Sequence, residues 1–154
     1  MGDDINSLLQ SLYSDEARAY AVLNLKNKET VTKENAIKAI EVYEKAGDFD
    51  EAGDIAKAAG LIERAVDNYA KAGNFVHAVD VAKEAGLTGK IIELYEKNQR
   101  YDEAGTIAEG EGLFEKAMQN YEKAGRFNDA ADVAEKAGLP ERVEIYKTLN
   151  ELVY

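Results

Sequence analysis

The stretch LIERAVDNYAKAGNFVHAVDVAKEAG, residues 61–86, sets the fold because its pattern recurs along the chain with a period of about 26 residues. Four kinds of residue keep this step: a tyrosine, a glycine that precedes leucine, an alanine and a second aromatic. These columns hold Tyr43, Tyr69, Tyr95 and Tyr121; Gly60, Gly86, Gly112 and Gly138; Ala52, Ala78, Ala104 and Ala130; and Phe49, Phe75, Tyr101 and Phe127. A fixed period of this length is the signature of a solenoid, in which copies of one structural unit stack.

Each unit is predicted to be a pair of short helices. Ile62, Ala65, Val66 and Tyr69 fall at i, i+3, i+4 and i+7, which is one apolar stripe of an α-helix. Gly73 then ends that helix, because glycine takes the left-handed conformation at a helix C-terminus without a clash. A second helix of similar length follows and ends at the next glycine. Isolated helices below about 12–15 residues are marginal in water, so these helices must be held by their neighbours.

We therefore expect an all-α fold, a right-handed α-solenoid of about four 26-residue helix-turn-helix repeats in a single domain, residues 1–154. The repeats as a whole are expected over residues 36–138, with helix pairs at about 36–60, 61–86, 87–112 and 113–138. Residues 1–35 lie outside the repeat and are expected to form N-terminal helices. Residues 139–154 are expected to form a closing helix, with Pro140 in its first turn.

The closing segment departs from the pattern. Lys147 occupies the tyrosine column, and Tyr146 comes one place early. Its end is unusually apolar, with Leu149, Leu152, Val153 and Tyr154. Terminal repeats normally present a polar outer face. We therefore expect this end either to fold back or to self-associate, and we favour a homodimer through the C-terminal helix.

Composition excludes several classes of function. A net charge of −11 argues against general nucleic-acid binding, which is driven by neutralisation of phosphates. The sequence holds no apolar run of about 18 residues, so no membrane insertion is expected. The chain has no cysteine, which removes disulfides and zinc–thiolate sites and fits a reducing cytoplasm.

No set of residues for catalysis, for metal binding or for a cofactor stands out. His77 is the only histidine, and it falls on the outward side of a second helix, where a solvated residue is expected. The acidic stretch 48–59 echoes a calcium loop, but Ala59 stands where such a loop needs its glutamate. The tyrosine column is a possible stacking platform, yet its place in the apolar stripe favours the core. We predict no enzyme, no metal site and no cofactor.

Charged columns carry more information about binding. The candidate partner-binding residues lie on the first helices, opposite the apolar stripe: Lys38, Arg64, Asn68, Lys71, Lys90, Lys97, Lys116, Asn120 and Lys123. The alternative is support within each helix, where opposite charges three and four residues apart contribute about 0.2–0.5 kcal/mol per pair. Most of the acidity falls in the second helices. We expect a neutral, lysine-striped first-helix surface that binds a protein or peptide of acidic or mixed charge.

The motifs YEKAGDFDEAGDIAKAAGL (43–61) and YEKAGRFNDAADVAEKAGL (121–139) resemble a tetratricopeptide-type α-solenoid. They are most similar to the short helical repeats of SNAP-type vesicle-fusion adaptors and of clathrin- or coatomer-like solenoids. The shared features are tyrosine before Lys-Ala-Gly, an aromatic two residues after the glycine, and an alanine three further on. The resemblance implies a protein-binding scaffold. A tetratricopeptide unit has about 34 residues, and its tryptophan and late proline are missing here, so no groove residue is carried over.

Three functions of different classes follow, with a fourth ranked below them. The first is a non-enzymatic interaction module, a scaffold or adaptor that binds through its first-helix surface. The second is a self-assembling structural component that acts through the ends of the solenoid. An enzyme on a helical scaffold is a third, and RNA reading by helical repeats a fourth. RNA-reading repeats vary at their base-contacting positions, whereas the columns here are uniformly lysine or arginine apart from the two asparagines.

Overall fold

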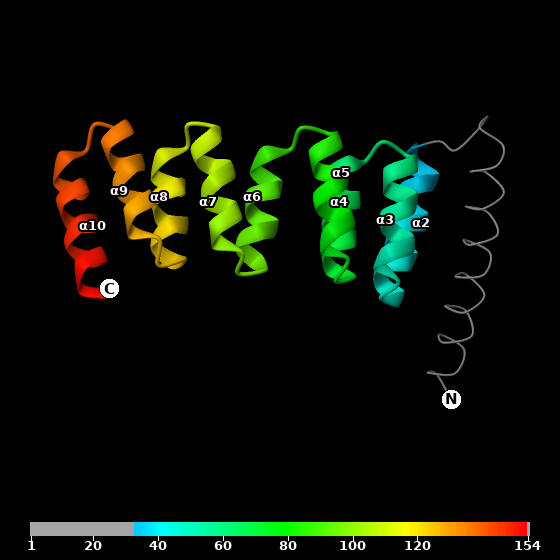
Figure 1. Ribbon diagram of the computed structural model, residues 1–154. Coiled ribbons are helices and arrows are strands. Elements are labelled where there is room, and N and C mark those ends of the chain that lie inside the picture. Colours follow the sequence, from blue (N-terminus) through cyan, green and yellow to red (C-terminus); the bar gives the residue numbers. More distant parts are fainter. Residues whose placement is uncertain (1–32, 154) are drawn as a thin grey trace. The chain divides into compact units, whose positions relative to one another are not determined.

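The computed structural model describes residues 33–153, and all the regular structure of this part of the chain is helical, with no strand (Figure 1). Its helices are α2 Lys33–Ala46, α3 Phe49–Ala58, α4 Ile62–Lys71, α5 Phe75–Glu84, α6 Thr88–Lys97, α7 Tyr101–Gly110, α8 Phe114–Lys123, α9 Phe127–Lys136 and α10 Pro140–Val153. The all-α prediction and the predicted helix pairs are confirmed. The helices expected in residues 1–32 lie outside the described residues.

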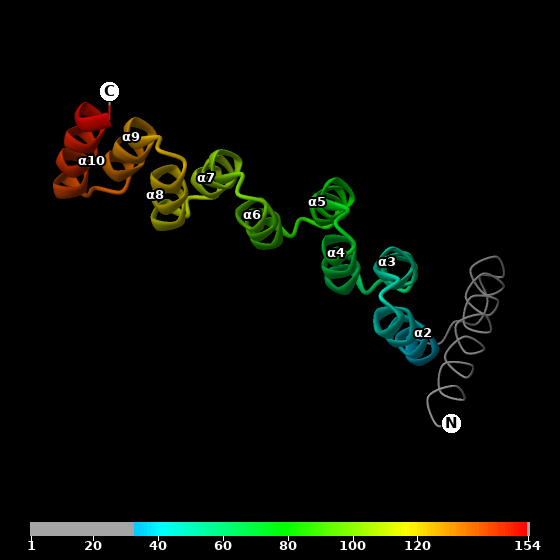
Figure 2. The ribbon, with the colours of Figure 1, turned by 90° about the horizontal axis from the view of Figure 1, so that it is seen from below.

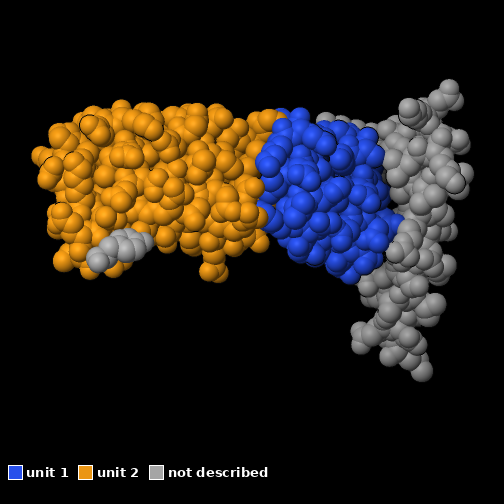
Figure 3. Space-filling model, viewed as in Figure 1, with its two compact units in different colours: residues 1–85 blue, residues 86–154 orange. Residues whose placement is uncertain are grey.

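Within each of two compact units, the described helices pack on their neighbours in the sequence. These units are residues 1–85 and 86–154 (Figure 3). In the first unit α2 packs on α3, α3 on α4 and α4 on α5. In the second unit the same order runs from α6 to α10. Consecutive packing of this kind is the arrangement of a solenoid-like helical repeat. A single domain over the whole chain and a right-handed superhelix stay predictions.

Within each unit the first and second helices of the repeats form separate layers (Figure 2). In the second unit α6 and α8 lie on one side, and α7 and α9 lie on the other. In the first unit α2 and α4 are separated from α3 and α5 in the same way. We call the outer surface of α2 and α4 in one unit, and of α6, α8 and α10 in the other, the first-helix surface.

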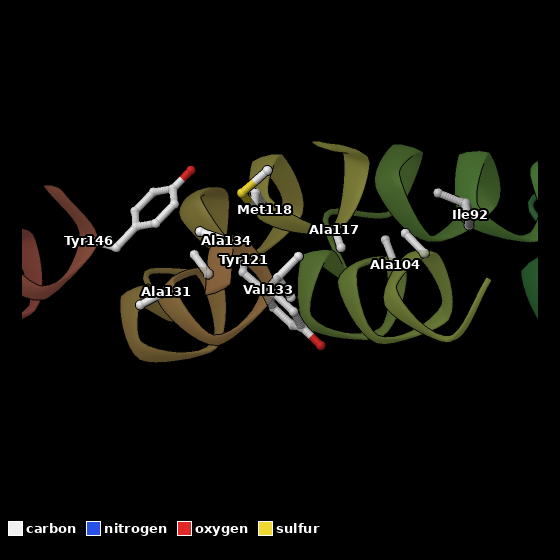
Figure 4. Close-up of a cluster of buried hydrophobic side chains, with 11 residues drawn as sticks. Ile92, Ala104, Ala117, Met118, Tyr121, Ala131, Val133, Ala134 and Tyr146 are labelled. Carbon is white, nitrogen blue, oxygen red and sulfur yellow. The ribbon is translucent and has the colours of Figure 1, made fainter. Parts of the chain in front are cut away.

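Small residues let these layers approach closely. Ala52, Ala65, Ala104 and Ala117 have no exposed surface. The buried cluster of the second unit is built mainly from alanines, with Ile92, Met118, Val133 and two tyrosines filling the spaces between helices (Figure 4). A core of alanines gains little from each side chain. Its stability therefore depends on how closely the backbones pack.

The tyrosine column lies in the core, as the apolar stripe predicts. Tyr43, Tyr69 and Tyr121 are each only 2% exposed, and Tyr95 is partly buried against the cluster of the second unit. The core interpretation is confirmed for the three buried rings. The stacking-platform alternative fails for them, because a fully covered ring offers no face to a partner.

Two of the tyrosines lie directly against glycines. A Cβ built on Gly53 would come within 2.7 Å of the Tyr69 ring, and one built on Gly105 within 2.8 Å of the Tyr121 ring. Real Cβ atoms do not approach so closely. The glycine in the middle of α3 and of α7 is therefore required by packing, although glycine weakens a helix by about 0.5–1 kcal/mol relative to alanine.

Most of the described helices end in the same turn, in which a glycine with positive φ follows the last residues of the helix. At Gly125, for example, the Gly125 N–H donates to the Glu122 carbonyl and the Arg126 N–H to the Tyr121 carbonyl. This pair of bonds defines the Schellman motif. Gln99 holds the equivalent turn after α6 with φ of 57°, the only non-glycine residue with positive φ among those described.

The last helix differs from the expected end. Tyr146, and not the residue in the tyrosine column, is its buried aromatic, at 3% exposed. Leu149 packs partly against the cluster of the second unit. Leu152 and Val153 are 78% and 59% exposed, so neither folds back onto the core. The expectation for Tyr154 lies outside the described residues.

The close contact between glycine and tyrosine gives a first test. Gly105→Ala should destabilise the protein by about 1–3 kcal/mol, the usual effect of overpacking, because the Tyr121 ring must move. Gly110→Ala in the same helix has open space around its Cβ and should stabilise by up to about 1 kcal/mol. Urea denaturation of both variants measures the difference. Equal effects at the two positions would contradict the packing role of Gly105.

The turn after α6 gives a second test. A left-handed conformation costs a non-glycine residue about 1–2 kcal/mol. Against this, glycine loses more conformational entropy than other residues on folding, which costs about 0.5–1 kcal/mol. Gln99→Gly should therefore raise the free energy of unfolding by up to about 1 kcal/mol. The reverse change, Gly125→Gln, should lower it by a similar amount. The two melting temperatures should move in opposite directions, and a shared direction would refute the argument from backbone strain.

Candidate interaction surface

Glu44 of α2 joins the two first helices of the first unit. Arg64 of α4 donates to its carboxylate through Nε at 3.0 Å and Nη2 at 2.8 Å. Asn68, fully buried, donates from Nδ2 at 2.9 Å to the same carboxylate. The Arg64 hydrogen bonds are the largest cause that lowers the pKa of Glu44 to about 2, and the Asn68 bond adds to it. We call these three residues the Glu44 cluster.

The second unit repeats this arrangement between α6 and α8. Asn120, also fully buried, donates from Nδ2 at 2.8 Å to the Glu96 carboxylate. Lys116 stands where Arg64 does and lies 3.5 Å from the other carboxylate oxygen. We call these three residues the Glu96 cluster. Each cluster is a polar bridge that fixes the register of one first helix on the next.

Four of the predicted binding residues therefore serve the helix stack: Arg64, Asn68, Lys116 and Asn120. The two asparagines have no accessible surface, so they cannot meet a partner in this conformation and we remove them from the binding surface. Arg64 and Lys116 are partly exposed, but each is already paired across the helices. A bound protein that drew Arg64 or Lys116 to itself would weaken the ion pair with Glu44 or Glu96.

In α6 the candidate lysines pair within their own helix. Lys97 lies 2.7 Å from the Glu93 carboxylate, and Lys90 lies 3.6 Å from it. The Lys97 hydrogen bond is the main cause that lowers the pKa of Glu93. For this helix the structure shows the intrahelical support that the spacing allows. Both ammonium groups remain at the surface, with 64% of the Lys97 side chain exposed.

Lys71 and Lys123 are different, because each lies over an aromatic ring of the preceding helix, α3 or α7. The Lys71 Nζ is 5.7 Å from the centre of the Phe49 ring, and the Lys123 Nζ is 5.4 Å from the centre of the Tyr101 ring. Both lysines are exposed, and no salt bridge to either is seen among the described residues. The charge of Lys71 nevertheless acts on the carboxylate of Glu44 and helps to lower its pKa. A cation–π contact at an exposed site contributes only about 0.5–1 kcal/mol. Lys38 is likewise exposed, on α2.

Carboxylates also hold the hydroxyls of the buried tyrosines. Tyr69 donates to Asp54 at 2.6 Å and Tyr121 to Glu109 at 2.8 Å, while Tyr146 donates to Glu122. Burial is the first cause that raises the pKa of all three phenols, and that of Tyr146 reaches about 12. These carboxylate partners were not predicted from the sequence, because each lies on a different helix from its tyrosine.

The surface of the second helices is acidic but extensively paired. Lys136 lies 2.6 Å from Glu109, and Arg126 lies 2.8 Å from Asp129. The prediction for His77 was wrong in part. Its ring is half-buried and meets the edge of the Tyr69 ring, with the ring centres 4.3 Å apart. His77 therefore packs on the core instead of standing free in solvent.

Two open hollows occur on the described surface. One, of about 390 Å³, lies between the turn from α8 to α9 and Asn150 of α10, with Arg126, Phe127 and Asp129 in its lining. The other, of about 460 Å³, lies at the start of α4. Neither brings together an acid, a base and a nucleophile. Between residues 33 and 153, no group of three or more acidic or histidine side chains is placed to hold a metal ion.

None of the described helices is both long and apolar enough to cross a bilayer.

The Glu44 cluster predicts a dependence of stability on pH. Because the folded pKa of Glu44, about 2, is below the value of about 4.3 expected for an unfolded chain, its contribution is present at neutral pH and is lost as pH falls from about 5 toward 2. Glu44→Gln should therefore lower the free energy of unfolding at pH 7, and the deficit should shrink at pH 3.5.

The matched control is Glu63→Gln, an exposed change at the start of α4. Urea denaturation at the two pH values should show only a small deficit for this variant. A Glu44→Gln deficit that is the same at both pH values would contradict the ion pair with Arg64.

The chain was compared with family models, curated proteins and solved structures, and no match was found in any of the three comparisons.

Proposed function

We propose that this chain is a non-enzymatic protein-binding module whose first-helix surface receives an acidic or mixed-charge segment of a partner. The observation that carries the proposal is the state of Lys71 and Lys123. The two occupy the same column, are exposed, and lie over aromatic rings, and neither forms a salt bridge among the described residues. An exposed cation held in one direction by a weak contact is ready to pair with a carboxylate from outside.

The rest of that surface supports the proposal. Lys97 adds a third exposed ammonium group in the same column, although it already forms a salt bridge with Glu93. Charges of this kind act mainly on the rate of association and on selectivity, since complementary potentials steer the encounter. Within its own unit, Lys71 or Lys123 offers a partner the most, because neither forms a salt bridge among the described residues that binding would have to break.

The resemblance to tetratricopeptide-type and SNAP-type repeats leads to the same proposal of a scaffold or adaptor, by analogy of fold alone. A chain without cysteine suits a reducing compartment. We propose the cytoplasm as its location.

Self-association is the second candidate function. It is favoured by the exposed apolar side chains of α10, which include Ile145, Leu152 and Val153. A homodimer through α10 would cover them. Sedimentation of the full chain over a range of concentrations tests this candidate directly.

Charge reversal tests the first candidate once a partner has been captured. Lys71→Glu and Lys123→Glu should each lower the association rate constant, by about tenfold at low salt, with a smaller change in the dissociation rate constant. Added salt should weaken binding of the parent chain, because exposed charges are screened over about 10 Å at 0.1 M. Surface plasmon resonance separates the two rate constants.

Exposed carboxylates of the second helices provide the controls. Asp80→Lys in α5 and Asp132→Lys in α9 change a charge by the same amount on the other layer. They should leave the association rate within about twofold of the parent value. Loss of binding in these variants, with the lysine variants unaffected, would assign the working surface to the second helices.

A further inference from the structure

Several kinds of contact join one repeat to the next inside each unit, and the polar bridges are the first kind. The Glu44 cluster and the Glu96 cluster lie in the same columns of the sequence, two repeats apart. In the repeat between them these columns hold Ala70 and Leu94. Neither side chain can form a hydrogen bond or an ion pair. The series of polar bridges is therefore interrupted between the two clusters.

The contact between glycine and tyrosine is interrupted at the same repeat. A Cβ built on Gly53 would come within 2.7 Å of the Tyr69 ring. One built on Gly105 would come within 2.8 Å of the Tyr121 ring. In the column of these glycines the repeat between them holds Val79. A tyrosine ring placed as in the two units would collide with the Cβ of this valine, so the contact cannot be repeated there.

Ion pairs between the second helices show the same interruption. Lys57 of α3 lies 3.6 Å from Glu84 of α5. Lys136 of α9 lies 2.6 Å from Glu109 of α7. In both pairs the two residues are 27 apart in the sequence. The same spacing in the repeat between them leads to Gly110, which has no side chain to offer.

The starts of the second helices carry a fourth kind of contact. Asn74 donates to Asp50 at 3.3 Å, and Arg126 lies 3.6 Å from Asp102. In the column of the two aspartates the repeat between them holds Val76, which is 67% exposed. An apolar side chain can neither accept a hydrogen bond nor attract a cation. The fourth series is therefore broken as well.

All four interruptions fall at one boundary. The residues that replace the contacting ones belong to helices α4 to α7, and they are Ala70, Val76, Val79, Leu94 and Gly110. They flank the point at which the chain divides into its two compact units (Figure 3). The polar bridge resumes one repeat after the Glu96 cluster, where Tyr146 of α10 donates to Glu122 of α8. The interruption is therefore a property of this boundary.

The helix that begins the second unit is also weakly started. Gly89 lies in the first turn of α6, where α4, α8 and α10 have Glu63, Glu115 and Glu141. A carboxylate near a helix N-terminus stabilises the helix, and glycine weakens it. A Cβ built on Gly89 would meet no packed neighbour within 4 Å among the described residues, so packing does not require the glycine. The first turn of α6 therefore lacks both the charge and the backbone stiffness of these three helices.

We propose that the chain folds and unfolds as two separate cooperative units, with the boundary in the sequence between α5 and α6. The stability of a helical repeat is the sum of terms within each repeat and terms between neighbours. The four kinds of contact supply such terms inside each unit, and the sequence at the boundary supplies none of the four. One unit can therefore open while the other stays folded, as cooperative segments of folded proteins do.

Separate folding has a consequence for binding. Lys71 belongs to the first unit and Lys123 to the second. A ligand stabilises the folded form to which it binds. A partner held at Lys71 would thus stabilise the first unit and leave the second unchanged. The inference goes beyond the proposed function, and it can be tested without a partner.

Hydrogen exchange of the full chain, followed by mass spectrometry of its peptides, tests the inference with a matched pair of variants. Gly53→Ala should speed exchange of the slowest amides of α3 and α4 at least about fivefold, because the Tyr69 ring must move. The amides of α7 and α8 should stay within about twofold of the parent rates. Gly105→Ala should give the reverse pattern.

A second pair of variants covers the case in which the added methyl group prevents a unit from folding. Glu44→Gln and Glu96→Gln each remove the ion pair of one cluster without adding bulk. Each should speed exchange at least about threefold in its own unit and less than about twofold in the other. A unit that a glycine variant unfolds would exchange completely, and the other unit should still exchange like the parent.

Equal acceleration of exchange in both units by any of these variants would overturn the inference and show one cooperative array. Acceleration confined to the helix that carries the variant would overturn it too, because the cooperative segments would then be smaller than the two units. Reciprocal patterns from both pairs of variants are the expected result, and they would establish the boundary between α5 and α6.

Discussion

A helix of ten residues is too short to be stable alone, and this constraint governs the described structure. Such a helix spans about 15 Å, and most helical stability in proteins of this kind comes from packing against neighbours. Each helix therefore depends on the one before and the one after it within its unit. Alanines allow the backbones to approach, and Tyr69 and Tyr121 fit against glycines of the preceding helix. The polar bridges at Glu44 and Glu96 then fix one register among several that an alanine surface would accept.

The helices and the core could be predicted from the sequence because both follow from local, periodic columns. The partners across helices could not, since a bond such as that of Asn68 with Glu44 joins residues 24 apart on different helices. One feature of the sequence does indicate these contacts, namely residues that recur at every second repeat. Gly53, Asn68 and Glu44 recur two repeats later as Gly105, Asn120 and Glu96, whereas the intervening repeat holds Val79, Leu94 and Ala70. The doubled period marks both the glycine contacts and the polar bridges.

The sequence predicted which residues lie on the candidate surface better than it predicted which of them are already paired. The lysine columns lie outward as expected. Some of their residues already form ion pairs, however: Lys97 with Glu93, Arg64 with Glu44 and Lys116 with Glu96. The apolar character of the last helix was also visible in the sequence. Its direction was not, because that depends on Arg142 and Tyr146 meeting α8. A shift of one place in the tyrosine column is enough to turn an apolar face from the inside of the stack to its surface.

The turns of this chain also limit how the protein can change in length. Successive described helices are joined by only two or three residues, and the positive-φ positions from Gly47 to Gly138 follow one another at a constant step, half that of the repeat. An added residue inside a helix would turn everything after it by about 100° and move the alanines out of contact. There is no long loop in the described part to absorb the error. Over evolutionary time such a chain is expected to gain and lose whole helix pairs, while its individual helices stay fixed in length.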